Sequence, residues 1–229
     1  MNNTYEIGIF GKLPAHGDFV ERNLPRAFVS VWDEWLQRCL ASSQDSAGEQ
    51  WLDYFLTSPV WRFGLGQGCV DSNAWVGLLV PSVDSVGRYF PITVVIKLSD
   101  RADPFDTLLN QGHILDEATD LLVEALHTTI DVDTLWQHLN SLKNHYNVTS
   151  SDQSMYLEQH GINLCQTHQG SDENRAAKLI YPLSRLNNAS SSLWMCDGNE
   201  EIMPTIFTAA NLPNPECYLP MITNDWRPI

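Results

Sequence analysis

Basic side chains are scarce in this sequence. Its 229 residues include 13 lysines and arginines against 28 aspartates and glutamates, a formal net charge of −15. The imbalance grows along the chain, from −4 over residues 1–100 to −11 over residues 101–229. Nucleic acids and anionic membrane surfaces bind proteins through clusters of lysine and arginine. The composition therefore argues against both as partners.

The sequence also lacks the segments that direct a chain into a membrane. It has no charged-then-apolar leader at its start and no apolar run of about 18 residues. Its five cysteines are odd in number and scattered, without a C-x-x-C pair, which is typical of free thiols in a reducing compartment. We therefore expect a cytoplasmic protein with no direct membrane insertion.

Recognisable catalytic and cofactor-binding motifs are missing as well. There is no G-x-S-x-G and no H-E-x-x-H. Gly11-Lys12 does not form a phosphate-binding loop, because Leu13 stands where Ser or Thr is needed and Glu6 where the first glycine is needed. The glycines of 64–68 precede an apolar run typical of a strand, whereas a dinucleotide site requires a helix there. We expect no cofactor.

Residues 147–175 have little periodic pattern, since Ser, Asn, Gln and Gly dominate them. This composition predicts a linker or a surface excursion. The segment contains His160, Cys165 and His168. Structural zinc sites use four ligands, and catalytic sites use three with a water. No fourth ligand is close in sequence, so we predict no metal site.

The chain does contain ample material for a core, with 43% hydrophobic residues and eight tryptophans. Its length allows one large domain or two small ones. Apolar side chains on both faces of the segment 92–98 indicate helices on both sides of a sheet. Helical periodicity predicts helices over 25–42, 114–128 and 133–145, and capping-box spacing from Ser46 to Glu49 predicts another through Phe55. Apolar runs predict strands over 60–65, 74–80, 92–98, 193–196 and 203–207.

Two polar segments with glycines stand out, residues 8–25 and residues 81–91. The first lies between a short strand pattern and an amphipathic helix, a natural place for function. Opposite charges flank both segments, so we predict that Asp18 and Asp84 lie near Arg22 or Arg88 and clamp the two loops together. The residues singled out are Gly11, Lys12, Leu13, Pro14, Gly17, Asp18, Phe19, Arg22, Pro81, Ser82, Asp84, Gly87 and Arg88.

These two segments resemble the markers of a known family. The residues Gly11-Lys12-Leu13-Pro14 with Gly17-Asp18-Phe19, and the block from Pro81 to Pro91, are similar to the TagF (also called ImpM) family of bacterial proteins. The resemblance is dense over residues 7–98 and sparse afterwards. It implies a single TagF-like domain over residues 1–229 and an α/β fold, a three-layer α-β-α sandwich. Short turns between predicted strands lead us to expect a mixed, partly antiparallel central sheet.

The resemblance also implies a function. TagF proteins are accessory regulators of type VI secretion, and act as post-translational repressors that hold the apparatus off after its components have been made. They are linked with the forkhead-associated scaffold protein, and in some bacteria they are joined to a phosphatase domain, of which we expect no segment here. The implied partners are therefore type VI secretion components, bound by a protein that is not an enzyme.

An enzymatic alternative remains open. A loop with His16 and Asp18, joined in space by Asp84 or Ser82, could carry out acid–base chemistry, as in a hydrolase or a phosphoprotein-processing enzyme. The opposing interpretation is that the aspartates pair with arginines and fix the loops. A concave pocket with His16 open and unpaired would favour the enzyme, and aspartates buried against arginines would favour a binding module.

Residues 100–133 carry nine acidic side chains and one basic one. On the predicted helix 114–128, Asp116, Asp120 and Glu124 recur at i, i+4 and i+8, so we expect all three to point outward. Such a face is either a solvated surface or a docking surface for a basic partner. The pattern leaves both interpretations open.

Overall fold

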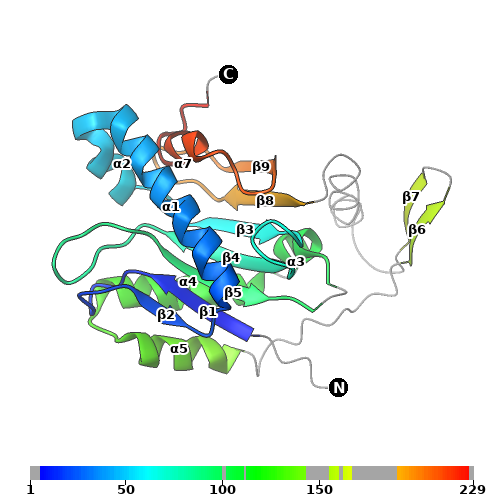
Figure 1. Ribbon diagram of the computed structural model, residues 1–229, viewed down its shortest axis with the longest axis horizontal. Coiled ribbons are helices and arrows are strands. Elements are labelled where there is room, and N and C mark those ends of the chain that lie inside the picture. Colours follow the sequence, from blue (N-terminus) through cyan, green and yellow to red (C-terminus); the bar gives the residue numbers. More distant parts are fainter. Residues whose placement is uncertain are drawn as a thin grey trace.

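The computed structural model describes residues 6–99, 102–110, 112–142, 155–159, 162–166 and 190–226. Its centre is a seven-stranded sheet with the order β2-β1-β5-β4-β3-β8-β9, in which every neighbouring pair is antiparallel (Figure 1). The strands are β1 (Glu6–Gly11), β2 (Val20–Arg22), β3 (Trp61–Leu65), β4 (Trp75–Val80), β5 (Ile92–Lys97), β8 (Ser191–Cys196) and β9 (Thr205–Ala210).

The expectation of a mixed sheet is therefore wrong. The strands β3, β4 and β5 follow one another without a crossover helix, and such connections produce antiparallel neighbours. The strands β1 and β8 then join the two sides of this unit, again in antiparallel register. The result is an α/β fold in which all the pairings of the seven-stranded sheet are antiparallel.

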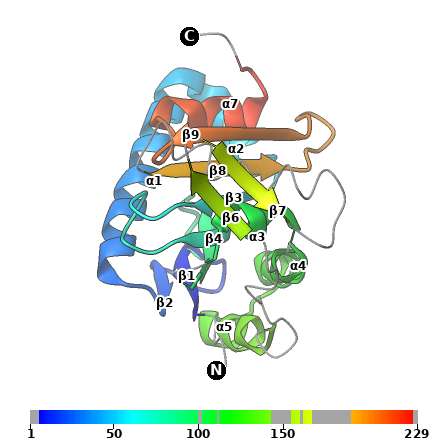
Figure 2. The ribbon, with the colours of Figure 1, turned by 90° about the vertical axis from the view of Figure 1, so that its right-hand side faces the viewer.

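Helices lie on both faces of the sheet, as the apolar character of β5 indicated (Figure 2). Neighbouring β5 residues serve different cores, since Val94 belongs to the core beneath one set of helices and Val95 to the core beneath the other. One set is α1 (Arg26–Ala47), α2 (Trp51–Leu56) and α7 (Tyr218–Thr223), and the other is α3 (Pro104–Asn110), α4 (His113–His127) and α5 (Val132–Ser141).

The core beneath α1 is aromatic. Trp32 is fully buried, and its ring stacks almost parallel to that of Trp194, with 6.3 Å between the centroids. Its indole N–H donates to Thr93 Oγ1 at 2.9 Å, so its polar atom is satisfied. Trp35 and Trp51 are buried as well, so the tryptophans of residues 32–51 all lie in this core. The stacking on Trp194 connects β8 to the N-terminal half of the chain.

The main helices and strands lie where they were predicted, but β2, α3 and α7 were not predicted, and the strand expected over 203–207 runs from Thr205 to Ala210. The predicted capping box is also absent. The helix α1 runs to Ala47, so Ser46 lies inside it and makes no capping box. The chain turns at Gly48, where φ is +56°, and passes through a short 3-10 helix, Gly48–Gln50, into α2, which has no side-chain cap. A glycine after the last helical residue ends the helix here.

The segment predicted as a linker contains one regular feature. Strands β6 (Met155–Gln159) and β7 (Ile162–Gln166) form a separate two-stranded antiparallel sheet. His160, His168 and the side chain of Cys165 lie outside the described residues, so the prediction of no metal site there stays a prediction. Among the helices that the structure describes, none has the length and apolar character to span a bilayer.

Candidate functional site

The two motif segments are joined by a buried ion pair. Lys12 Nζ lies 2.5 Å from Asp84 Oδ2, and only 6% and 0% of the two side chains are exposed. Ser82 Oγ donates to the backbone carbonyl of Lys12 at 2.7 Å, which adds a second link between the segments. The loop after β1 and the loop after β4 therefore form one unit, called the motif loops below.

Asp84 is hydrogen-bonded on both carboxylate oxygens. Oδ1 accepts from the backbone N–H groups of Val86 (3.1 Å) and Arg88 (2.8 Å), and Oδ2 accepts from Lys12 and from Arg88 Nε at 2.7 Å. Burial by itself would raise the pKa of Asp84, but these donors outweigh it and hold the pKa well below its usual range. The group is therefore an ionised structural carboxylate and not a proton donor at neutral pH.

Arg88 connects the outer parts of the motif loops. It donates to the carbonyl of Gly17, and its guanidinium lies 3.6 Å from the exposed carboxylate of Asp18. Both aspartates therefore lie at Arg88, as expected. Arg22 does not take part, because its Nε donates to Asp133 Oδ1 at 2.7 Å and connects β2 to α5 instead.

Sequence reasoning missed Lys12 as the buried partner. Lysine is almost never fully buried unless it is paired, so its sequence context alone gave no signal of burial. Two of the three motif glycines, Gly11 and Gly87, are explained by backbone geometry. Gly11 has φ of +135°, and a Cβ there would lie 2.1 Å from the carbonyl oxygen of Pro91. Gly87, with φ of +85°, forms the turn that brings Arg88 back to Asp84.

His16 contacts the N-terminus of α5. Its Nε2 accepts a hydrogen bond from the backbone N–H of Val132 at 2.9 Å, beside Asp131, which caps the helix by accepting from Asp133 and Thr134. The imidazole is half-buried in this contact. Among the described contacts His16 and Asp18 share no hydrogen bond, so the structure does not bring the two proposed catalytic groups together.

The motif loops expose three large apolar side chains beside the charged Asp18 and Arg88. Phe19, Val86 and Tyr89 are 49%, 68% and 36% exposed. The Phe19 ring contacts Phe90 edge-on, with 4.8 Å between centroids, and Lys12 Nζ lies 5.2 Å from the centre of the Phe19 ring. The Tyr89 ring lies edge-on to those of Trp51 and Phe55 in α2, with 6.5 and 6.2 Å between centroids. Exposed apolar side chains on loops of fixed geometry are candidates for contacts with a partner. We call Phe19, Val86 and Tyr89 the motif-loop surface.

The acidic face of α4 is exposed, as predicted for Asp116, Asp120 and Glu124. The three residues are not equivalent, however. Asp116 Oδ1 lies 2.8 Å from an Arg62 guanidinium nitrogen, so it connects α4 to β3. Arg62 also pairs with Asp197 at 3.1 Å. Asp116 therefore has a structural partner that the helical pattern did not reveal.

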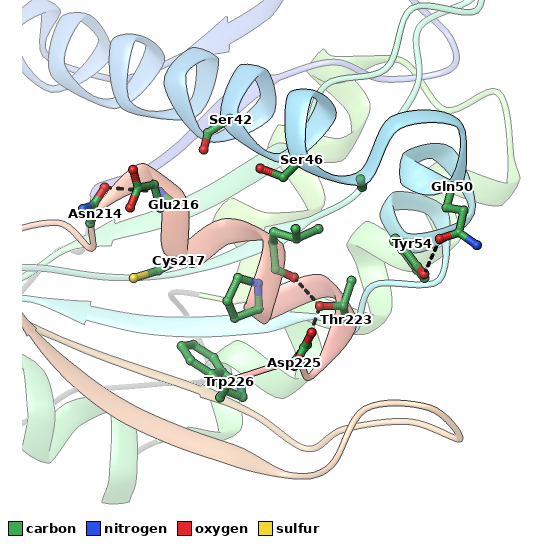
Figure 3. Close-up of a pocket in the computed structure, with 13 residues that line it drawn as sticks. Ser42, Ser46, Gln50, Tyr54, Asn214, Glu216, Cys217, Thr223, Asp225 and Trp226 are labelled. Carbon is green, nitrogen blue, oxygen red and sulfur yellow. Dashed lines mark hydrogen bonds between the residues drawn. The ribbon is translucent and has the colours of Figure 1, made fainter. Parts of the chain in front are cut away.

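A cavity of about 680 Å³ lies away from the motif loops, between α1, α2 and α7 (Figure 3). Tyr54 and Gln50 line it from one side and are hydrogen-bonded to each other at 3.0 Å, while Thr223 and Trp226 line it from α7 and its C-terminal end. Its walls come from residues 42–54 and 214–226, so no local sequence pattern could predict it. Among the described residues, no three His, Cys, Asp or Glu side chains are grouped to hold a metal ion.

Comparison with known proteins identifies the family. Residues 8–142 match the N-terminal domain of TagF, which is type VI secretion system-associated. The fold is similar to the crystal structure of PA0076 from Pseudomonas aeruginosa PAO1, with a TM-score of 0.78, 31% sequence identity, and coverage of 97% of this chain and 96% of that chain. A search of curated proteins finds no match. The family match covers more than half of the chain and includes both motif segments, so this protein belongs to the TagF family of type VI secretion system-associated proteins.

Proposed function

We propose that the protein is a non-enzymatic accessory regulator of type VI secretion that represses the apparatus post-translationally by binding one of its components. Membership of the TagF family supports the pathway. The observation that carries the binding role is the buried Lys12–Asp84 pair, which fixes two loops and leaves Phe19, Val86 and Tyr89 exposed on them. Aromatic and apolar side chains on a preorganised surface bind partners at a low entropic cost.

The proposed partners are cytoplasmic components of the secretion apparatus, with the forkhead-associated scaffold protein as the first candidate. This choice rests on the family resemblance. The acidic composition supports a protein partner over a nucleic acid, because the chain has few basic residues with which to displace counterions. Binding would take place at the motif-loop surface.

The hydrolase alternative has less support. A general base needs a free lone pair within reach of its substrate. His16 Nε2 already accepts the Val132 N–H, and Asp84 is surrounded by donors. Both groups are therefore engaged in holding the loops in place.

The experiment that tests the proposal compares a deletion strain with a strain that overproduces the protein. Secreted tube protein in the culture supernatant should rise on deletion and fall on overproduction, while the transcripts of the secretion components stay unchanged in both strains. Unchanged secretion in both strains would falsify the assignment. A change in secretion that follows a change in transcripts would place the control at gene expression and contradict a post-translational role.

A further inference from the structure

The strand β9 is the last strand of the seven-stranded sheet, and among the described residues it pairs only with β8 (Figure 2). The Asn211 N–H donates to Ser190 O, so Asn211 and Ser190 form a hydrogen-bonded pair of this antiparallel ladder. Hydrogen-bonded and non-hydrogen-bonded pairs alternate from there along β8 and β9. Every second residue of β9 then bonds to β8, and the backbone groups of Ile206, Thr208 and Ala210 point away from it. A row of backbone donors and acceptors is thus presented at this edge of the sheet.

Natural proteins usually protect an exposed edge with charges, prolines, bulges or very short strands. The opposite edge follows this rule, since β2 has three residues and two of them are Glu21 and Arg22. The strand β9 has six residues, Thr-Ile-Phe-Thr-Ala-Ala, without a charge or a proline. Ile206, its second residue, is 56% exposed. One edge of the sheet is therefore protected, and no strand among the described residues pairs with the other edge.

The sequence around β9 is acidic, and Arg62 of β3 pairs with one of its carboxylates, that of Asp197. Residues 190–226 contain five acidic side chains and no lysine, arginine or histidine. Glu200 and Glu201 are exposed in the loop that leads directly into β9. A second copy of the chain would bring the same acids against these, and like charges oppose such a contact. A basic segment would be attracted to this edge.

An aromatic ring flanks the same strand. Trp226 is 40% exposed and lies with its centroid 5.1 Å from that of Phe207 in β9. Tryptophan is the ring that binds a lysine or arginine cation best. The edge thus offers backbone hydrogen bonds, carboxylates and an aromatic face within one region.

We propose that β9 binds an extended, basic segment of a secretion component by strand addition. The inference rests on the proposed function, in that the partner is a type VI secretion component. In this binding mode, hydrogen bonds to Ile206, Thr208 and Ala210 give affinity, and lysine or arginine side chains that face Glu200 and Glu201 give selectivity. The site is separate from the motif-loop surface and adds a second contact to the same regulator.

The test uses the full chain and an array of overlapping twelve-residue peptides that covers the secretion components of the host bacterium. Thr208→Pro removes an N–H that points away from β8, while Thr208→Val keeps it, so the second variant is a matched control. Basic, strand-forming peptides should bind the wild type and Thr208→Val alike. They should bind Thr208→Pro about tenfold more weakly, which corresponds to about 1.4 kcal/mol.

A second variant tests the same binding site in case Thr208→Pro disturbs the fold. Glu200→Lys with Glu201→Lys should lower the affinity for the same peptides at low salt. Hydrogen exchange then identifies the residues that the peptide contacts. With the strongest peptide bound, the amide hydrogens of Ile206, Thr208 and Ala210 should exchange at least about tenfold more slowly than in the free protein. The exchange rates of the motif-loop amides should not change.

Equal binding by Thr208→Pro and Thr208→Val, retention of acidic peptides, or protection of the motif loops in place of β9 would overturn the inference. A wild-type dimer in ultracentrifugation that Thr208→Pro dissociates would also overturn it, since a second copy would then occupy the edge. Failure of the proposed function is a separate result, because it would appear as unchanged secretion in the deletion strain.

Discussion

The charged groups of Lys12 and Asp84 are both buried, so each is stabilised by the other in place of water. Removal of one partner from a buried pair costs about 3–5 kcal/mol, because the remaining charge stays buried without compensation. We expect Lys12→Met to lower the free energy of unfolding by about this amount, and Asp84→Ala to express poorly or unfold early. Urea denaturation measures the loss.

Arg88→Met is the matched control for this prediction. Arg88 also bonds to Asp84, but its side chain is 57% exposed and its loss leaves Lys12 in place. Solvent screens the exposed guanidinium of Arg88, which weakens its pairing with the buried carboxylate of Asp84. The Arg88 variant should therefore lose much less free energy of unfolding than Lys12→Met. Equal losses would contradict the account of Lys12 as the buried link.

The low pKa of Asp84 gives a dependence on pH. A carboxylate whose pKa is lower in the folded state stabilises the fold above its unfolded pKa of about 3.9, and the contribution is lost as pH falls toward the folded value. The melting temperature of the wild type should therefore exceed that of Asp84→Asn most above pH 4. The difference should shrink steadily between pH 4 and pH 2. A constant difference over this range would contradict the assignment of the effect to Asp84.

Residue-level contacts could be predicted where two loops carried opposite charges, as for Asp18, Asp84 and Arg88. The partner of Arg22 could not be predicted, because Asp133 lies 111 positions away on a helix whose place depends on the whole fold. The buried role of Lys12 could not be predicted either. A lysine in a polar loop is usually solvated, and only the packing of Phe19 above it reveals otherwise.

At the scale of elements, the acidic face of α4 separates into two parts. Asp120→Lys with Glu124→Lys should change stability by about 0.5 kcal/mol or less for each substitution, as is usual for exposed positions. Asp116→Lys should cost more, because it breaks the pair with Arg62 and places two cations together. Thermal melting of the variants checks this order, and equal melting temperatures for all of them would contradict it.

The same double variant tests whether the face is a docking surface. Charged patches chiefly raise the association rate, and salt screens them with a Debye length of about 8 Å at physiological ionic strength. We expect the double variant to associate more slowly than the wild type with the partner at low salt. Surface plasmon resonance at two salt concentrations measures the rates, and identical rates at low salt would show that the face is only solvated.

Elements with a clear period could be predicted from the sequence, and their arrangement could not. The apolar stripe of α1 and the continuous apolar residues of β4 and β5 specify a helix and two buried strands. Strand order and direction depend on contacts between distant segments, such as β3 with β8. No local sequence pattern shows these contacts, so the sequence could not reveal that the sheet is antiparallel throughout. The open edge at β9 was missed for the same reason.

At the scale of the whole molecule, the sheet extends beyond the residues that match the TagF model. The strands β8 and β9 follow residue 142, and Trp194 of β8 is buried against Trp32. We propose that these strands fold with residues 8–142 as one domain. A fragment of residues 8–142 would expose this aromatic core to water, so it should aggregate or unfold without a cooperative transition.

Circular dichroism melting checks this expectation, with the full chain as the control under the same conditions. The full chain should unfold in one cooperative transition. A fragment of residues 8–142 that melts cooperatively near the same temperature would show that β8, β9 and α7 are not required, and would contradict the single-domain proposal.

The central claim is that the motif-loop surface represses secretion by binding a secretion component. Its most direct test is secreted tube protein in strains that carry Val86→Glu or, as the control, Val31→Glu. Both valines are exposed, at 68% and 40%, but only Val86 lies on the motif-loop surface. We predict that Val86→Glu raises secretion to the level of the deletion strain at unchanged protein abundance, while Val31→Glu secretes like the wild type. Wild-type secretion in the Val86→Glu strain would contradict the claim.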